Sequence, residues 1–210
     1  PQLAGAEERV RLPFSRQNIR VTGGMHERLN FSLNYSDWQH DEVANGEIAN
    51  QFFNKQFDYR LVLDQRRRGA FSGSFGIWGL QRDYEAVGAE AITPPVNQRS
   101  LAIFGVESIQ FQKAKLQFGG RVENTRYNPK TGANRRFTAF SGRAGLNVPL
   151  WKGGALVTSL NHSYRAPALE ELYSNGPHAG NLTFEIGDVN LRGERSNGAD
   201  AALRHTSARF

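Results

Sequence analysis

Residues 51–65 read QFFNKQFDYRLVLDQ, and this stretch decides the fold class. In its second half, apolar residues occupy every second position: Phe57, Tyr59, Leu61 and Leu63. The positions between them hold Asp58, Arg60 and Val62, and Asp64 follows. An alternation with a period of two puts apolar and polar side chains on opposite faces of a β-strand. The segment is also about twice as long as the roughly 5–6 residues of an ordinary globular strand.

The same alternation recurs along the chain, and no helical periodicity extends over a comparable length. Four other segments alternate in the same way, and their first apolar residues are Leu29, Leu116, Phe140 and Leu156. Long candidate strands also cover residues 70–84, 98–111 and 155–165, whereas a tilted membrane-crossing strand needs roughly 9–11 residues. The sequence therefore predicts an all-β protein with strands long enough to cross a bilayer.

The connections between these strands are predicted to alternate between short and long. The short ones are residues 23–28, 65–69, 112–115 and 149–154, and the long ones are 39–50, 85–98, 128–136 and 166–195. Aromatic residues gather near the expected strand ends: Tyr35, Trp38, Phe52, Phe53, Tyr84, Tyr127, Phe137 and Tyr164 on the long-loop side, and Phe71 and Trp151 on the other. Loops of alternating length and two aromatic girdles are typical of an antiparallel, up-and-down transmembrane β-barrel.

Composition limits the other classes. Hydrophobic residues make up 39% of the chain, and there is no apolar run long enough for a transmembrane helix. Cysteine is absent, which excludes disulfides and thiolate metal sites. The net charge of +6 would permit a nucleic-acid partner, but apart from Arg66–Arg68 the basic residues are scattered, so we expect none.

Two alternatives to an active-transport barrel stay open. A soluble antiparallel β-sandwich that binds a ligand also has strands with one apolar face, and a passive porin-like barrel has the same loop pattern. About nine strands are predicted, an odd number for a bacterial barrel, and the chain has neither an initiator methionine nor a signal peptide. We therefore expect residues 1–210 to be part of a larger barrel domain.

Residues 164–187, YRAPALEELYSNGPHAGNLTFEIG, followed by DVNLRGERSNGADAALRH at 188–205, resemble the late-barrel signature of TonB-dependent outer-membrane receptors. Asn190, Leu191, Glu194, Ser196 and Asp200 match this signature, whereas Gly193 replaces its usual proline and Asp188 its frequent asparagine. Residues 35–63 and 76–96 are similar to the mid-barrel of the branch that includes zinc-uptake receptors.

The resemblance implies a barrel of about 22 strands in the outer membrane, closed inside by an N-terminal plug domain. It implies active uptake of a metal ion or a metal chelate (siderophore-bound iron, zinc or haem) with energy from the TonB complex. The implied partners are the TonB complex, reached through an N-terminal region, the plug domain, the cargo and outer-membrane lipid. The plug domain and the remaining strands are expected outside this sequence.

The candidate metal ligands are His40, Asp41, Glu42 and His178, which are predicted to lie in long loops on one side of the membrane. Zinc binds histidine nitrogen and carboxylate oxygen, so these residues could form a zinc site. The alternative is that His40 to Glu42 begin a solvated loop and that His178 is a turn residue. His162 is expected to lie at the membrane interface rather than bind a metal.

No enzyme is predicted, because the sequence has no nucleophile elbow, phosphate-binding loop or HExxH motif. The adjacent Glu170 and Glu171 would diverge on a helical turn and make a poor acid–base pair. No cofactor is expected. Polar residues on the inward side of the strands should line the lumen and, by the family resemblance, hold the plug: Asp58, Arg60, Arg121, Glu123, Arg143 and Arg165.

Overall fold

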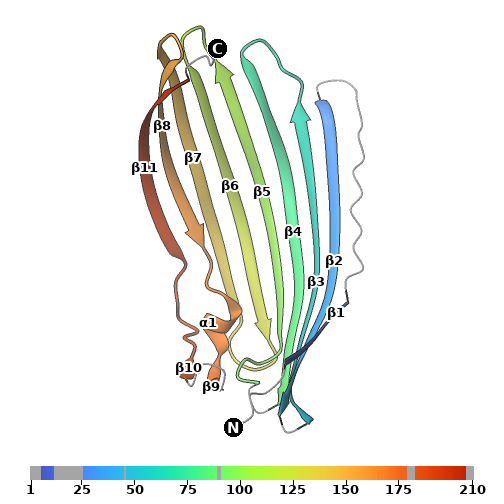
Figure 1. The fold of residues 1–210 in the computed structure, drawn as a ribbon. Helices are drawn as coiled ribbons and strands as arrows, with labels where there is room; N and C mark the ends of the chain where they lie inside the picture. The colour runs from blue at the N-terminus through green and yellow to red at the C-terminus, as the bar shows by residue number, and fades with distance from the viewer. Residues whose placement is uncertain (1–5, 12–25, 45, 89–90, 179–182, 207–210) are drawn as a thin grey trace.

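The computed structural model describes residues 6–11, 26–44, 46–88, 91–178 and 183–206. Nine strands form one antiparallel sheet in the order β1-β2-β3-β4-β5-β6-β7-β8-β11, so neighbours in the chain are neighbours in the sheet (Figure 1). Their bounds are β1 (Ala6–Arg11), β2 (His26–Ala44), β3 (Glu47–Gln65), β4 (Phe71–Gly88), β5 (Val96–Gln110), β6 (Lys115–Pro129), β7 (Arg135–Trp151), β8 (Gly154–Arg165) and β11 (Glu194–His205).

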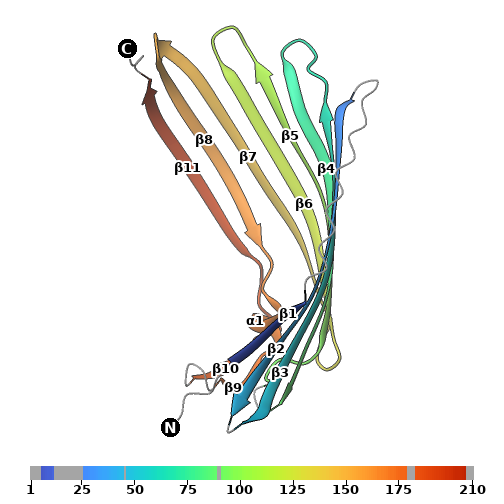
Figure 2. The same cartoon turned by 45° about the vertical axis from the view of Figure 1, so that its right-hand side comes forward.

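Between β8 and β11 the chain forms a short helix and a small hairpin. These elements are α1 (Leu169–Tyr173), β9 (Asn175–His178) and β10 (Thr183–Ile186), and β9 pairs only with β10 in the described part of the chain. The sheet is curved like a section of a barrel wall, and α1 lies on its concave side (Figure 2). We call the side that α1 covers the inner face and the opposite side the outer face. No helix among the described residues has the length and apolar character to cross a bilayer.

The prediction of an all-β, up-and-down antiparallel wall of nine strands is confirmed. Within the described residues β1 and β11 are the edges of the sheet, so the wall is open and not a closed barrel. The sandwich alternative is wrong for this part of the chain, because the only other sheet described there is the two-stranded β9–β10 hairpin. A sandwich needs a second sheet that covers one whole face of the first.

The outer face carries a continuous apolar row in the middle of the wall. The register places one apolar side chain from each of six neighbouring strands opposite the next: Phe31, Leu61, Ile77, Ile103, Val122 and Phe140. Ile103 is 66% exposed and Phe140 is 56% exposed. A contiguous apolar surface of this kind is costly in water and indicates a face that contacts lipid or another protein.

The inner face carries charged and aromatic side chains that contact each other. The guanidinium of Arg60 lies 4.8 Å from the ring centre of Phe104, and that of Arg121 lies 4.9 Å from the ring centre of Trp78. Arg121 Nε also donates a hydrogen bond to Glu123 at 2.8 Å. The residues predicted to face the lumen therefore share one face of the sheet, as the alternation required.

The prediction of a long loop at residues 39–50 is wrong. β2 and β3 stay paired up to Ala44 and Glu47, so most of that segment is strand. The sequence Asn45-Gly46 is a typical hairpin closure, and Gly46 has a φ of +82° that favours glycine. Of the first short connection, residues 23–28, residues 23–25 lie outside the described residues and residues 26–28 belong to β2. The long connection between β8 and β11 is confirmed.

The aromatic girdle on the long-loop side is only partly confirmed. Strand parity puts Tyr35 and Phe53 on the outer face, where a girdle must lie. The inner face instead holds Trp38, Phe52, Tyr84, Tyr127 and Phe137. At the other end, Phe71 and Trp151 are both about half exposed. Position near a strand end indicates depth along the wall, but only strand parity decides the face.

Candidate functional site

The segment after β8 forms α1 because its backbone is capped at both ends. Ala168 has extended geometry (φ −68°, ψ 161°), and its N–H donates a hydrogen bond to the carboxylate of Glu171 at 2.7 Å. At the other end, the N–H of Ser174 donates to the carbonyl of Glu170 at 3.0 Å. A helix of this length is not stable alone, so packing against the wall must hold it.

The packing comes from two leucines one helical turn apart. Leu169 is 1% exposed and Leu172 is 2% exposed, and they form a cluster with Val96, Tyr127 and Phe137 of the inner face. Spacing of three residues puts both leucines on one side of the turn, and full burial of each stabilises by roughly 1.5–3 kcal/mol. The hydroxyl of Tyr127 also donates to the carbonyl of Pro167 at 2.9 Å.

Arg165, the last residue of β8, links α1 to β11. Its guanidinium donates to both carboxylate oxygens of Glu171, at 3.0 and 2.9 Å, and to both oxygens of Glu194, at 2.9 and 2.8 Å. The hydrogen bonds from Arg165, together with the one from the Ala168 N–H, lower the pKa of the Glu171 carboxyl below its usual value. This pair of bidentate contacts fixes the start of the loop and its return to the sheet at one point.

Further hydrogen bonds tie the same segment to the neighbouring connections. The hydroxyls of Thr93 and Ser174 lie 2.8 Å apart, and the N–H of Asn175 donates to the carbonyl of Ile92 at 2.7 Å. Tyr173 donates through its hydroxyl to the carbonyl of Ala133 at 3.1 Å, and burial raises the pKa of its hydroxyl. These contacts hold α1 and the residues that follow it against the neighbouring connections.

Beside α1 the inner face has a hollow of about 320 Å³. Its lining is mixed: charged and polar groups from Gln98, Arg121, Glu123 and Thr125 meet the rings of Tyr127 and Phe137. Arg82, on the same face, lies 3.6 Å from a carboxylate oxygen of Glu170 and donates to Asn54 at 2.8 Å. The hollow can accept a polar ligand or a polar segment of chain, but its charged groups already have partners.

The predicted metal ligands do not come together. Among the described residues, no group of three or more His, Cys, Asp and Glu side chains is arranged to hold a metal ion. His40, Asp41 and Glu42 lie on β2 rather than in a loop, so Asp41 faces the side opposite to its two neighbours. Asp41 accepts hydrogen bonds from Gln39 and Gln51, whereas His40 Nε2 lies 3.8 Å from Glu42.

His178 lies at the end of β9, within the long connection as predicted. Its Nδ1 lies 2.7 Å from Oε1 of Glu185 on β10, a residue that the sequence did not bring into consideration. The predicted set therefore divides into two histidine–carboxylate pairs, His40 with Glu42 and His178 with Glu185. The ring of His162 stacks on Phe140 and its Nδ1 lies 2.7 Å from the Asn197 side-chain oxygen.

The residues of this site that were missed from the sequence include Arg82, Thr93 and Glu185, and Tyr127 in its role as a hydrogen-bond donor to the loop. Parity along β4 puts Arg82 on the same face as Trp78, and this signal was present in the sequence. The contact between Thr93 and Ser174 had no sequence signal, because it joins residues 81 positions apart in two irregular connections.

Comparison with known proteins agrees with this architecture. Residues 5–210 match the family model described as "TonB dependent receptor-like, beta-barrel". A solved structure named "Copper transporter OprC" is similar in fold, with a TM-score of 0.69 at 17% sequence identity over 89% of this chain. The match covers 34% of that structure, so the chain spans about a third of its length. The chain belongs to the TonB-dependent receptor β-barrel family.

Proposed function

We propose that the chain is part of the barrel wall of an outer-membrane receptor that takes up a metal ion or a metal chelate with energy from the TonB complex. The observation that carries the proposal is the two-faced wall within a member of this family. A continuous apolar row lies on the outer face, and a network of arginines, carboxylates and aromatic rings lies on the inner face. Such a wall suits lipid outside and a polar lumen inside.

Metal-related cargo is supported by the similar structure, whose name is that of a copper transporter. Copper therefore joins zinc, siderophore-bound iron and haem as candidate cargo. The proposal assigns no catalytic residue to this chain. Parts of the receptor outside this sequence would help to contact the TonB complex and a plug domain.

For a bare metal ion, the candidate ligands are the two histidine–carboxylate pairs. His40 and Glu42 lie on the inner face, and His178 lies beside Glu185; Asp41, the other predicted ligand, is on the outer face and belongs to neither pair. Zinc and copper usually need more than two protein ligands, so each pair would share the ion with a chelator, water or another part of the receptor.

The test is cargo uptake by cells that make the full-length receptor. Zinc, copper, a ferric siderophore and haem are supplied separately as labelled cargo, with and without a functional TonB complex. Saturable uptake of one cargo that stops without TonB supports the proposal. Uptake that is not saturable and is unchanged without TonB would identify a passive pore, and absence of uptake for all four cargoes would overturn the metal assignment.

A further inference from the structure

Three arginines lie side by side on the outer face, on neighbouring strands. The register places Arg99 of β5 opposite Arg126 of β6, and Arg126 opposite Arg136 of β7. All three side chains are exposed. Adjacent strands are about 4.8 Å apart, so this arginine row extends over roughly 10 Å across the wall.

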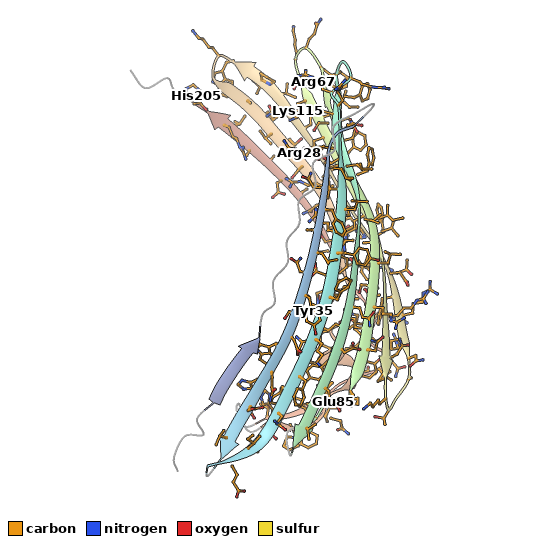
Figure 3. The ribbon with its side chains drawn as sticks, turned by 90° about the vertical axis from the view of Figure 1, so that its right-hand side faces the viewer. Arg28, Tyr35, Arg67, Glu85, Lys115 and His205 are labelled. Atoms are coloured by element: carbon orange, nitrogen blue, oxygen red, sulfur yellow. The ribbon has the colours of Figure 1, made fainter. Side chains whose placement is uncertain are left out.

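The arginine row lies at the edge of the apolar band. The next outward-facing row toward the middle of the wall consists of Leu101, Asn124 and Thr138. The row after that is apolar and consists of Ile103, Val122 and Phe140. In the other direction across the sheet, the row continues through Gln81 to Phe57 and Tyr35, both partly exposed aromatic residues. Tyr35 is labelled in Figure 3 and marks the depth of this row on β2.

Aromatic rings of this kind lie at the boundary between the hydrocarbon core and the headgroups. The three arginines share their row, so they lie at headgroup depth if the wall spans a membrane. Arginine extends its charged group to the same level when its stem lies along an apolar surface.

The charge of this row is not balanced by the described part of the protein. Like charges directly opposite each other destabilise a sheet. Among the described residues, no ion pair joins any of the three arginines to a carboxylate, and Arg126 donates only to the side chain of Asn124, at 3.2 Å. The nearest carboxylate by register is Asp83, which accepts a hydrogen bond from Asn97 at 2.6 Å.

The inner face shows the opposite arrangement. There Arg121 is paired with Glu123, Arg165 with Glu171 and Glu194, and Arg82 with Glu170. Three inward arginines thus have carboxylate partners, whereas no arginine of the outer row is paired with a carboxylate among the described residues.

We propose that Arg99, Arg126 and Arg136 form a binding site for a lipid headgroup that carries two phosphates, of the lipid A type. Guanidinium groups bind phosphate oxygens through paired hydrogen bonds, and a row of three over this distance matches two phosphates better than one. The adjoining apolar band provides a surface for the acyl chains, which a nucleic acid or a free polyphosphate lacks. This inference rests on the proposed membrane location and is independent of the cargo.

The experiment uses the full-length receptor purified in detergent and compares three forms of it. The test variant carries Arg99→Gln, Arg126→Gln and Arg136→Gln. The matched control carries Arg66→Gln, Arg67→Gln and Arg68→Gln, which removes the same charge from an exposed turn at the other end of the wall; Arg67 and Glu85 mark the two ends in Figure 3. Retained heat-modifiable migration on gels checks that each form is folded.

Bound lipid is measured by native mass spectrometry after addition of diphosphoryl lipid A, monophosphoryl lipid A or phosphatidylglycerol, with inorganic pyrophosphate as a competitor. The wild type and the control should bind diphosphoryl lipid A most tightly. The test variant should bind it about a hundredfold more weakly, as expected for the loss of three basic residues at a membrane surface.

Equal binding by the test variant and the wild type would overturn the proposal, as would an equal loss in the control. Full displacement by pyrophosphate would identify a free-anion site instead of a lipid site. Equal binding of phosphatidylglycerol would overturn the requirement for two phosphates. A receptor that stays folded and monomeric without detergent would instead contradict the membrane location itself, which keeps the two failures distinguishable.

Discussion

Arg165 and Glu171 are joined by two parallel hydrogen bonds, at 3.0 and 2.9 Å, although one residue ends a strand and the other lies in a helix. The same guanidinium reaches Glu194 at the start of β11. One arginine thus determines where the chain leaves the sheet and where it returns. The two ends of the connection between β8 and β11 are thereby held together.

The stability of the α1 loop should depend on pH through Glu171. Its pKa is lowered in the folded state, mainly by the hydrogen bonds from Arg165, so the folded loop binds fewer protons than the open loop. The contribution is fully present above the ordinary value of 4.5 and is lost as the pH falls through the lowered pKa. Hydrogen exchange of the α1 amides, corrected for intrinsic rates, should show more frequent opening in this acidic range.

The control for this prediction is Glu171→Gln. This variant should open more often than the wild type at neutral pH and should lose most of the added acid sensitivity of the α1 amides. An unchanged pH profile in the variant would show that another group is responsible.

Removing one buried leucine should release α1 from the wall. Leu169→Ala should destabilise the docked loop by about 2–4 kcal/mol, because it deletes a side chain that is 1% exposed and leaves a cavity against Tyr127 and Phe137. Leu191→Ala is the control, since that side chain is 37% exposed in the same connection and should cost less than about 0.5 kcal/mol. Limited proteolysis of folded receptor measures both, and equal cleavage rates would contradict the assigned role of Leu169.

Gly193 should resist substitution because a ring occupies the space of a side chain. A Cβ at this position would lie 2.1 Å from the Tyr164 ring, so Gly193→Ala requires the ring to move and should cost about 1–3 kcal/mol. In a Tyr164→Ala background the same substitution should cost much less. A double-mutant cycle on unfolding free energy measures the coupling, and additive effects would exclude this steric explanation. The usual proline of the family at this position would meet the same obstacle.

The two histidine–carboxylate pairs should differ from His162 in their effect on metal binding. If zinc is the cargo, His40→Ala and His178→Ala should each weaken zinc binding by the full-length receptor about tenfold or more, as measured by calorimetry. His162→Ala should leave zinc affinity unchanged, because His162 is engaged with Phe140 and Asn197. Unchanged affinity in the first two variants would exclude these histidines as ligands.

The face of each side chain was predictable from the sequence, and the course of the connections was only partly so. Alternation placed Arg60 and Arg121 on one face and Leu61 and Val122 on the other, because a strand has a period of two wherever it lies. The polar segment around His40 indicated a loop, yet polar side chains are equally compatible with a strand that extends beyond a membrane. The hairpin signal at Asn45-Gly46 was the better guide there.

By itself, the sequence determined the strand class, the order of the strands, the two faces of the wall and the family, since these depend on local periodicity and short motifs. Only the tertiary structure decided which residues meet: Arg165 with Glu194, Thr93 with Ser174, His178 with Glu185, and the three outer arginines with one another. These contacts depend on the register between strands and on the folding of a long connection. A shift of one residue in register would reverse the face of every side chain, and no local pattern in one strand records the register of its neighbour.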